Sequence, residues 1–249
     1  MNDICHFLPW DSEFFNLRIA KVVPNRLSHV SILLINKWCK ENSIDCIYFL
    51  ADPEFSVTTR IVEIDQYRLV DVRIIMHHEN NSFHEPNQPN ANYQVRPYRN
   101  SDLPSLRDIS RNIFTRSRFY SDPCFPKDKC DELYDVWIKN SCEGYADHVL
   151  VAEIKGLPQG FITCHVRQNR LEGDIGLVGV SEQARGNGIG KSLVQASLQY
   201  FYEQGVSSVF IAMQGSNIIA QKLCEHTDFS MYSLRLWYHK WFTACSPDI

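Results

Sequence analysis

The sequence predicts an α/β protein, and three observations lead to that fold class. Apolar segments of strand length alternate with amphipathic segments of helix length along the 249-residue chain. One apolar strand, at 173–180, runs into a glycine-rich loop that opens directly into a helix. A stretch rich in Asn, Pro and His over 77–92 separates a shorter N-terminal part from a longer C-terminal part.

Composition and charge argue against several classes of protein. Hydrophobic residues make up 44% of the chain and charged residues 22%, as in ordinary soluble globular proteins. The net charge of -4 argues against nucleic-acid binding as the main role. No apolar run approaches the length of a membrane span, and the N-terminus lacks a secretion-signal pattern, so we expect a cytoplasmic protein. The nine cysteines include no Cys-x-x-Cys pair, which favours reduced thiols over a disulfide framework or a zinc site.

Residues 1–78 are predicted to form a small α/β unit. Ser28 is a suitable N-cap for a first helix, and Pro53 opens a second helix that ends near Asp65. The apolar face of the first helix includes Ile32, Leu33, Ile35 and Trp38. The remaining segments are a turn with three aromatic residues at 10–15 and strands at 4–9, 17–23, 45–50 and 67–76.

Asp71 is a carboxylate in the middle of the strand predicted over 67–76. An acidic side chain at such a position lies either at a solvent-facing edge or in a functional site. The residues alone leave both alternatives open.

Residues 79–92 are predicted to be a linker between the two parts, because Asn and Pro favour irregular structure. His77, His78, His84 and Glu85 lie in or beside this stretch, but their spacing fits no standard metal site. We therefore expect a solvated linker and no bound metal.

Residues 93–249 are predicted to be one domain with the element order β-α-α-β-β-β-α-β-α-β. Ser101 is the expected cap of its first helix, which runs to about Ile113. The other predicted elements are a strand at 94–97, a helix at 127–140, a hairpin of 148–154 and 159–167, strands at 173–180, 206–213 and 229–242, and helices at 188–204 and 217–226.

Arg116 and Arg118 follow the first helix of this domain among aromatic residues that include Phe119. Arginine binds phosphate through two parallel hydrogen bonds and stacks on aromatic rings, so this segment could grip a phosphate-bearing substrate. The same residues could equally form a helix C-cap with packed aromatics.

The loop at 185–190 reads Arg-Gly-Asn-Gly-Ile-Gly. Its glycines allow successive backbone N–H groups to converge on one point, and the following helix adds free N–H groups and the positive end of its dipole. This pattern predicts a seat for an anion, most naturally a diphosphate. The spacing differs from that of a P-loop or a Rossmann fingerprint. A glycine-rich turn without a ligand is the alternative.

The order Arg-x-x-Gly-x-Gly, after a strand ending at Val180 and before a helix beginning Lys-Ser-Leu-Val, resembles motif A of the GNAT acetyltransferases. The element order from Tyr93 is also similar to that family's. The resemblance implies the GNAT fold, with a central mixed, mostly antiparallel twisted sheet, here preceded by the smaller N-terminal α/β unit. It also implies that the strands at 173–180 and 206–213 splay apart to admit acetyl-CoA. The residues expected to hold the coenzyme are Leu177, Val178, Gly179, Val180, Arg185, Gly186, Asn187, Gly188, Ile189, Gly190, Lys191 and Asn217.

Four further regions resemble the dTDP-fucosamine acetyltransferase subfamily, which acetylates a 4-amino sugar nucleotide in bacterial surface-glycan synthesis. They are 8–15, 67–71, 117–119 with 137–138, and 217–224. On this interpretation Arg116 and Arg118 grip the phosphates of the substrate, and Trp10, Phe15 and Phe119 line its sugar or base site.

The subfamily resemblance assigns two catalytic candidates. Asp71 aligns with an acidic residue thought to act through water as the base, a role that burial would favour by raising its pKa. Cys224 occupies the position of the family's general-acid tyrosine. Its thiol could protonate the departing thiolate of CoA, or it is a plain buried helix cysteine. Tyr232 and Tyr238 on the last strand are spare candidates for the donor.

We therefore expect an acetyl-CoA-dependent N-acetyltransferase that acts on the amine of a nucleotide-linked amino sugar, with a homodimer as a possible assembly. One rival is a GNAT enzyme for another amine, such as a protein N-terminus, a lysine or a polyamine, although the Arg-aromatic run argues against a polyamine. The other rival is a CoA-binding module without turnover, which the acid at position 71 argues against.

Overall fold

A computed structural model describes residues 4–81, 92–168 and 171–243, and the chain divides into two compact units. Unit 1 comprises 1–73, 116–130 and 234–249, and unit 2 comprises 74–115 and 131–233. Each unit thus joins segments that are far apart in the sequence, whereas the sequence analysis predicts two continuous domains. Most of the expected linker, 82–91, lies outside the described residues.

Unit 1 contains a mixed sheet, in which β2 runs parallel to β3 while β1–β2 and β3–β10 are antiparallel. Its elements are β1 (Cys5–Phe7), α1 (Pro9–Phe15), β2 (Ile19–Val22), α2 (His29–Glu41), β3 (Cys46–Ala51), α3 (Ser56–Ile64) and α5 (Arg118–Ser121). Two long strands, β4 (Arg68–Glu79) and β10 (Ser230–Trp241), belong to this unit only up to Arg73 and from Leu234, respectively.

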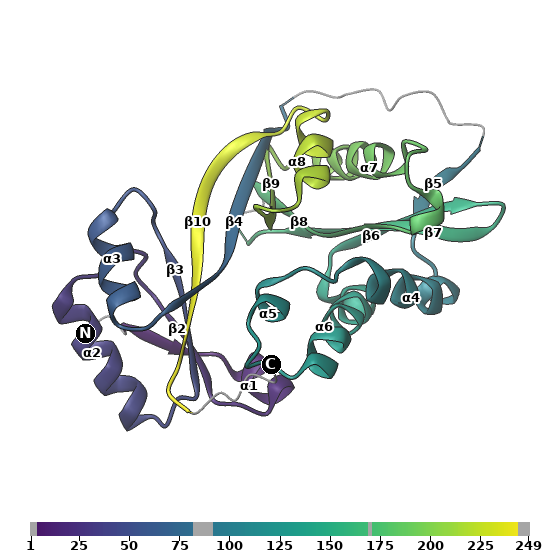
Figure 1. Cartoon of the computed structure of the whole chain (residues 1–249). Helices are drawn as coiled ribbons and strands as arrows, with labels where there is room; N and C mark the ends of the chain where they lie inside the picture. Colours follow the sequence, from purple (N-terminus) through teal and green to yellow (C-terminus); the bar gives the residue numbers. More distant parts are fainter. Residues whose placement is uncertain (1–3, 82–91, 169–170, 244–249) are drawn as a thin grey trace. The chain divides into compact units, whose positions relative to one another are not determined.

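Alternate residues of β3 and β10 face opposite sides of this sheet, as the period of a strand requires. Phe49 and Tyr238 belong to the apolar core that α2 and α3 cover (Figure 1). Ile32 and Ile35 of α2 point into that core, but Leu33 is 69% exposed. The expectation that Leu33 faces inward is therefore wrong, because a rotation of about 100° per residue carries it past the buried stripe.

The other side of the sheet in unit 1 carries an aromatic cluster. It consists of Phe15, Tyr48, Phe119, Phe125 and His239, with ring centroids 4.6 Å apart for both Phe15–Phe125 and Tyr48–His239. Phe15 reaches the cluster from helix α1, so the turn expected at 10–15 is wrong. Pro9 at the first helical turn fixes a suitable φ, and Asn16 ends the helix in the left-handed region at φ 53°.

Asp122 fastens the segment after α5 to strand β10. Its carboxylate accepts hydrogen bonds from Nδ1 of His239 at 2.7 Å and from Nε1 of Trp241 at 2.9 Å. Nδ1 of His239 therefore carries the proton, and Nε2 is left buried without a hydrogen-bond partner among the described residues. Burial lowers the pKa of His239 to about 4, so this ring is neutral at neutral pH.

Unit 2 follows the order predicted from Tyr93 onward. Its elements are β5 (Gln94–Pro97), η1 (Asn100–Asp102), α4 (Leu103–Ile113), most of α6 (Lys127–Asn140), η2 (Ser141–Tyr145), β6 (His148–Ile154), β7 (Leu157–Val166), β8 (Glu172–Val180), η3 (Glu182–Ala184), α7 (Ile189–Glu203), β9 (Ser208–Gln214) and α8 (Ile218–Glu225). Strands β5 to β8 pair antiparallel in sequence order, and β8 pairs parallel with β9. Helices α7 and α4 cover opposite faces of β6–β8 (Figure 1).

A buried ion pair holds the start of α4, in place of the cap expected from Ser101. The guanidinium of Arg96, only 6% exposed, donates to both carboxylate oxygens of Asp102 at 2.7 and 2.9 Å and to Glu153 at 2.6 Å. Asp102 also accepts the backbone N–H of Arg99 at 2.8 Å. The ion pair therefore joins β5, β6 and the first turn of α4, a long-range arrangement that local capping rules do not reveal.

Most cysteines of the described residues are free thiols, as expected. They are Cys5, Cys39, Cys46, Cys130, Cys142, Cys164 and Cys224. Cys124 is disulfide-bonded, which corrects the expectation that every cysteine is reduced. Cys245 lies outside the described residues.

The histidines assigned to the linker have different placements. His77 and His78 belong to strand β4, and His84 with Glu85 lies outside the described residues. Within 4–81, 92–168 and 171–243, no group of three or more His, Cys, Asp or Glu side chains is arranged to hold a metal ion. None of the helices described there has both the length and the apolar character needed to cross a membrane.

We predict that His239 makes stability depend on pH in mildly acidic solution. Its pKa is about 4 in the fold and ordinarily about 6.5, so between these values the unfolded chain binds a proton that the folded chain does not. Stability is complete above pH 6.5 and falls as the pH is lowered towards 4, by about 3 kcal/mol from this group.

Urea unfolding of the wild type, His239→Phe and His29→Gln at pH 4.5, 5.5 and 7 measures this dependence. His239→Phe should be less stable at pH 7 and clearly flatter over the range, while the exposed-histidine control His29→Gln should keep the wild-type slope. An equal slope in His239→Phe and the wild type would show that His239 is not the titrating group.

Candidate active site

Strands β8 and β9 pair only over their first halves. The parallel ladder joins 172–175 to 208–211, and it ends at Ile175 and Ile211 although β8 continues to Val180 and β9 to Gln214. This register confirms the expected splay. The edge of β8 beyond Ile175 therefore offers backbone groups to an extended ligand, which can bind there as an added strand would.

The loop that follows β8 presents a row of free backbone donors. Gly186 and Gly188 both have φ of +80°, in the left-handed region that other residues rarely adopt, and Gly188 is the N-cap of α7. In the described part of the chain, the backbone N–H groups from 186 to 191 have no hydrogen-bond acceptor. These donors and the dipole of α7 are suited to binding an anion, as the sequence predicts.

Side chains around the loop hold its shape. The hydroxyl groups of Tyr93 and Ser192 lie 2.7 Å apart, which ties the first turn of α7 to the segment before β5. Asn187 donates to the carbonyl of Ala184 at 3.2 Å, and Ile189 is only 1% exposed. Because these contacts exist without a ligand, little conformational entropy remains to be lost when an anion binds.

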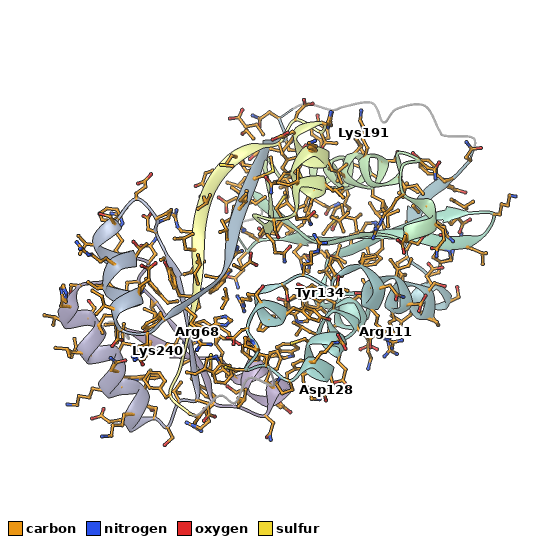
Figure 2. All side chains as sticks on the ribbon, in the orientation of Figure 1. Arg68, Arg111, Asp128, Tyr134, Lys191 and Lys240 are labelled. Carbon is orange, nitrogen blue, oxygen red and sulfur yellow. The ribbon has the colours of Figure 1, made fainter. Side chains whose placement is uncertain are left out.

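Two exposed cations flank the loop. Arg185 and Lys191 stand at its two ends, and Figure 2 shows Lys191 at the outer surface beside α7. Their charges are suited to a diphosphate placed on the loop amides. The loop residues that the sequence predicted for the coenzyme, 185–191, thus lie together at one end of α7.

Asn217 lies beyond β9 and begins α8. Its Oδ1 accepts the backbone N–H of Ala220 at 3.1 Å, so the side chain is the N-cap of that helix. The residue is exposed. Its amide NH₂ has no partner within the described ranges and is available to a ligand.

Cys224 is buried on α8, with 1% exposure. Burial raises the pKa of its thiol to about 12, which makes it a weaker acid than an ordinary thiol. Of its two expected roles, the structure favours the buried packing residue. Tyr238 is also engaged, because its hydroxyl donates to Glu63 at 2.9 Å, whereas Tyr232 is 65% exposed.

Asp71 is half-buried on β4 within unit 1. Burial raises the pKa of its carboxyl group, against the opposing effects of a 2.7 Å hydrogen bond from the Val72 N–H and of the Arg118 charge. A carboxylate with a raised pKa is a stronger base than an ordinary aspartate, which suits the predicted proton transfer.

Arg118 and Arg116 have different surroundings. The guanidinium carbon of Arg118 lies 4.7, 4.5 and 4.2 Å from the ring centroids of Tyr48, Phe119 and Trp237. This is the geometry of a cation–π cage. Arg116 is exposed at the start of the same segment. Only Arg118 is therefore held in a fixed position by its neighbours.

The three aromatic residues predicted to line the acceptor site differ in exposure. Phe15 and Phe119 are 3% exposed and pack at 5.1 Å within the aromatic cluster, so they support the surface from beneath. Trp10 is 40% exposed and stacks on Phe14 at 5.1 Å with an interplanar angle of 7°. Of the three residues, therefore, only Trp10 is exposed enough to contact a ligand.

Sequence reasoning missed three residues beside Arg118: Lys21, Tyr48 and Trp237. They lie on β2, β3 and β10, which are distant in sequence and adjacent in the sheet of unit 1. Tyr48 and Trp237 are ordinary residues for a strand and give no local sign of a site. Lys21 is a charged residue within the apolar strand β2, and it was the one signal in the sequence that could have indicated a site there.

Comparison with known proteins agrees with this geometry. The model of the family described as "Acetyltransferase (GNAT) family" matches residues 114–229. The chain is 27% identical over 142 residues to a dTDP-fucosamine acetyltransferase of Escherichia coli O6:H1, a match that covers 56% of this chain and 60% of that protein. It is 25% identical over 149 residues to the spore coat polysaccharide biosynthesis protein SpsD of Bacillus subtilis, covering 60% of this chain and 51% of that protein. The chain thus spans only about half to three fifths of these curated relatives.

The fold is similar to that of a solved GCN5-related N-acetyltransferase from Sphaerobacter thermophilus. The two superpose with a TM-score of 0.70 at 15% identity, over 96% of this chain and 76% of the other. Residues 114–229 therefore match a GNAT acetyltransferase domain, and the chain has the mixed sheet of the GNAT fold.

Proposed function

We propose that the protein is an acetyl-CoA-dependent N-acetyltransferase whose acceptor is the amine of a nucleotide-linked amino sugar, in the synthesis of a surface polysaccharide. The use of acetyl-CoA is supported by the loop at 186–191, whose backbone amides are free. This loop follows strand β8 directly, at the end where β8 no longer pairs with β9. The acceptor part is supported by the names of the two relatives, a dTDP-fucosamine acetyltransferase and a polysaccharide biosynthesis protein.

The residues present in unit 2 suit acetyl-CoA. The amides of 186–191 would hold its diphosphate, with Arg185 and Lys191 as counter-charges, and the edge of β8 would pair with its pantetheine arm. Asn217 would contribute its free amide group. The coenzyme supplies an activated thioester. Holding that thioester and the amine in line supplies a large share of the rate, up to about 7–11 kcal/mol for well-oriented reactants.

Asp71 is proposed as the base. A protonated amine has no lone pair and must lose a proton before it can attack the carbonyl carbon. The Asp71 carboxylate attracts the ammonium group and accepts its proton, directly or through water. No side chain is assigned as the acid, because a CoA thiolate is a tolerable leaving group and Cys224 is a weak acid in its buried position.

Mass spectrometry of reaction products tests the function. The purified protein is incubated with acetyl-CoA and a panel of amines: several amino-sugar nucleotides, the same sugars without nucleotide, and a lysine peptide. The proposal expects one added acetyl group on an amino-sugar nucleotide and not on the free sugars or the peptide. Acetylation of the peptide or of free sugars at equal rate would contradict it.

Replacement of Asp71 tests the base. Asp71→Asn should lower kcat by about 100-fold or more, because proton transfer of this kind contributes roughly 10²–10⁴-fold. The wild-type rate should fall as the pH drops through the raised pKa of Asp71, and the variant should lose that limb of the profile. Glu79→Gln, an exposed carboxylate on the same strand, is the matched control and should behave as the wild type. A wild-type pH profile in Asp71→Asn would assign the base elsewhere.

Replacement of Cys224 tests the packing role. Cys224→Ala and Cys224→Ser should keep kcat within about threefold of the wild type, with only a small loss of stability, since the thiol is buried and protonated. Steady-state rates and thermal unfolding measure both effects. A 100-fold loss of kcat in both variants, with unchanged unfolding temperature, would restore Cys224 as the acid.

A further inference from the structure

Unit 1 holds two cations on one aromatic ring. The guanidinium carbon of Arg118 lies 4.2 Å from the ring centroid of Trp237, and the ammonium nitrogen of Lys21 lies 5.5 Å from the same centroid. Trp237 is only 7% exposed, so its indole is a fixed floor beneath both cations. Because both positive charges lie over the same ring, they repel each other, and a nearby anion would offset that repulsion.

Neither cation forms an ion pair among the described residues, although Asp11 is near enough to both cations, and Asp71 to Arg118, for their charges to interact. In the described residues, no carboxylate lies within 4.0 Å of Lys21 or Arg118, although other lysines and arginines of unit 1 are paired, such as Lys240 with Asp65 at 2.7 Å. The pKa of Lys21 is lowered by burial and by the charges of Arg73 and Arg118, with Asp11 acting weakly in the other direction. The group therefore carries an excess of positive charge.

Two buried donors beside the cations also lack well-placed acceptors. Nε of Arg118 is buried without a hydrogen-bond partner among the residues described, and the buried hydroxyl of Tyr48 makes no hydrogen bond of normal geometry there, although it lies close enough to the Asp11 carboxylate to lower that group's pKa. Tyr48 is fully buried, and its ring forms another wall of the Arg118 cage at 4.7 Å. A buried donor without an acceptor costs about 1–3 kcal/mol, which a bound acceptor would recover.

We propose that Lys21, Arg118 and Tyr48 form an anion site of unit 1, and that its ligand is a phosphate group of the nucleotide-linked acceptor. A planar guanidinium and a point-charge ammonium are the two side chains that most often bind phosphate, and a phenol adds a third donor. The residues of this site all belong to unit 1, whereas the loop at 185–191 belongs to unit 2, and Arg118 rather than exposed Arg116 supplies the arginine. This inference rests on the proposed function for the identity of the ligand.

Binding of thymidine 5′-diphosphate, measured by calorimetry and tryptophan fluorescence, tests the site. The titration is run with saturating CoA, which occupies the loop at 185–191, so that thymidine 5′-diphosphate cannot bind there and be mistaken for a ligand of the unit 1 site. Thymidine without phosphate is the ligand control. Lys21→Gln and Arg118→Gln should each weaken binding at least about tenfold, Lys21→Arg should restore most of it, and Arg60→Gln, an exposed arginine of α3, should bind as the wild type.

The kinetics separate this inference from the proposed function. Lys21→Gln should raise KM for an amino-sugar nucleotide with little change in kcat or in KM for acetyl-CoA. If the wild type acetylates that substrate while Lys21→Gln and Arg118→Gln leave its KM and the diphosphate affinity unchanged, the function stands and the site is refuted. If the wild type neither binds the diphosphate nor acetylates a sugar nucleotide, both are refuted.

Discussion

The end of the β8–β9 ladder at Ile175 and Ile211 is the constraint on which the proposed coenzyme site depends. Continued pairing would use the backbone groups of β8 up to Val180 and would close the space between the two strands. Once the strands part, the free edge of β8 leads without interruption into the glycine loop and the first turn of α7. The end of β8–β9 pairing would thus leave both a free strand edge for the pantetheine arm of the coenzyme and a row of backbone amides for its diphosphate.

Unit 1 is built on a different physical basis. One side of its sheet carries a mainly aliphatic core beneath α2 and α3, and the other side carries the aromatic cluster. Aromatic faces attract cations without neutralising their charge. Arg118 can therefore be held rigidly by Tyr48, Phe119 and Trp237 and still bind an anion, whereas an arginine fixed by a carboxylate could not.

The parts of the site that the sequence predicts are those encoded by neighbouring residues. The strand, the loop at 185–190 and α7 are adjacent in the chain, and Gly186 and Gly188 meet a local need for positive φ. The cage around Arg118 could not be predicted, because its members lie on β3, α5 and β10 and meet only through strand pairing. A long-range contact also explains the error at Ser101, where Arg96 and Asp102 replace the cap. At Cys224 the sequence leaves two roles open, and only the burial of the thiol in the fold favours one of them.

Hydrogen exchange measured by mass spectrometry, with and without acetyl-CoA, tests the central claim most directly. Exchange of a backbone amide slows when the amide becomes hydrogen-bonded. The account predicts slower exchange in peptides that cover 176–180 and 186–191 on addition of acetyl-CoA, and little change in peptides of β5 and β6. Unchanged exchange over 176–191, with protection appearing elsewhere in the chain, would contradict the assignment of the coenzyme site.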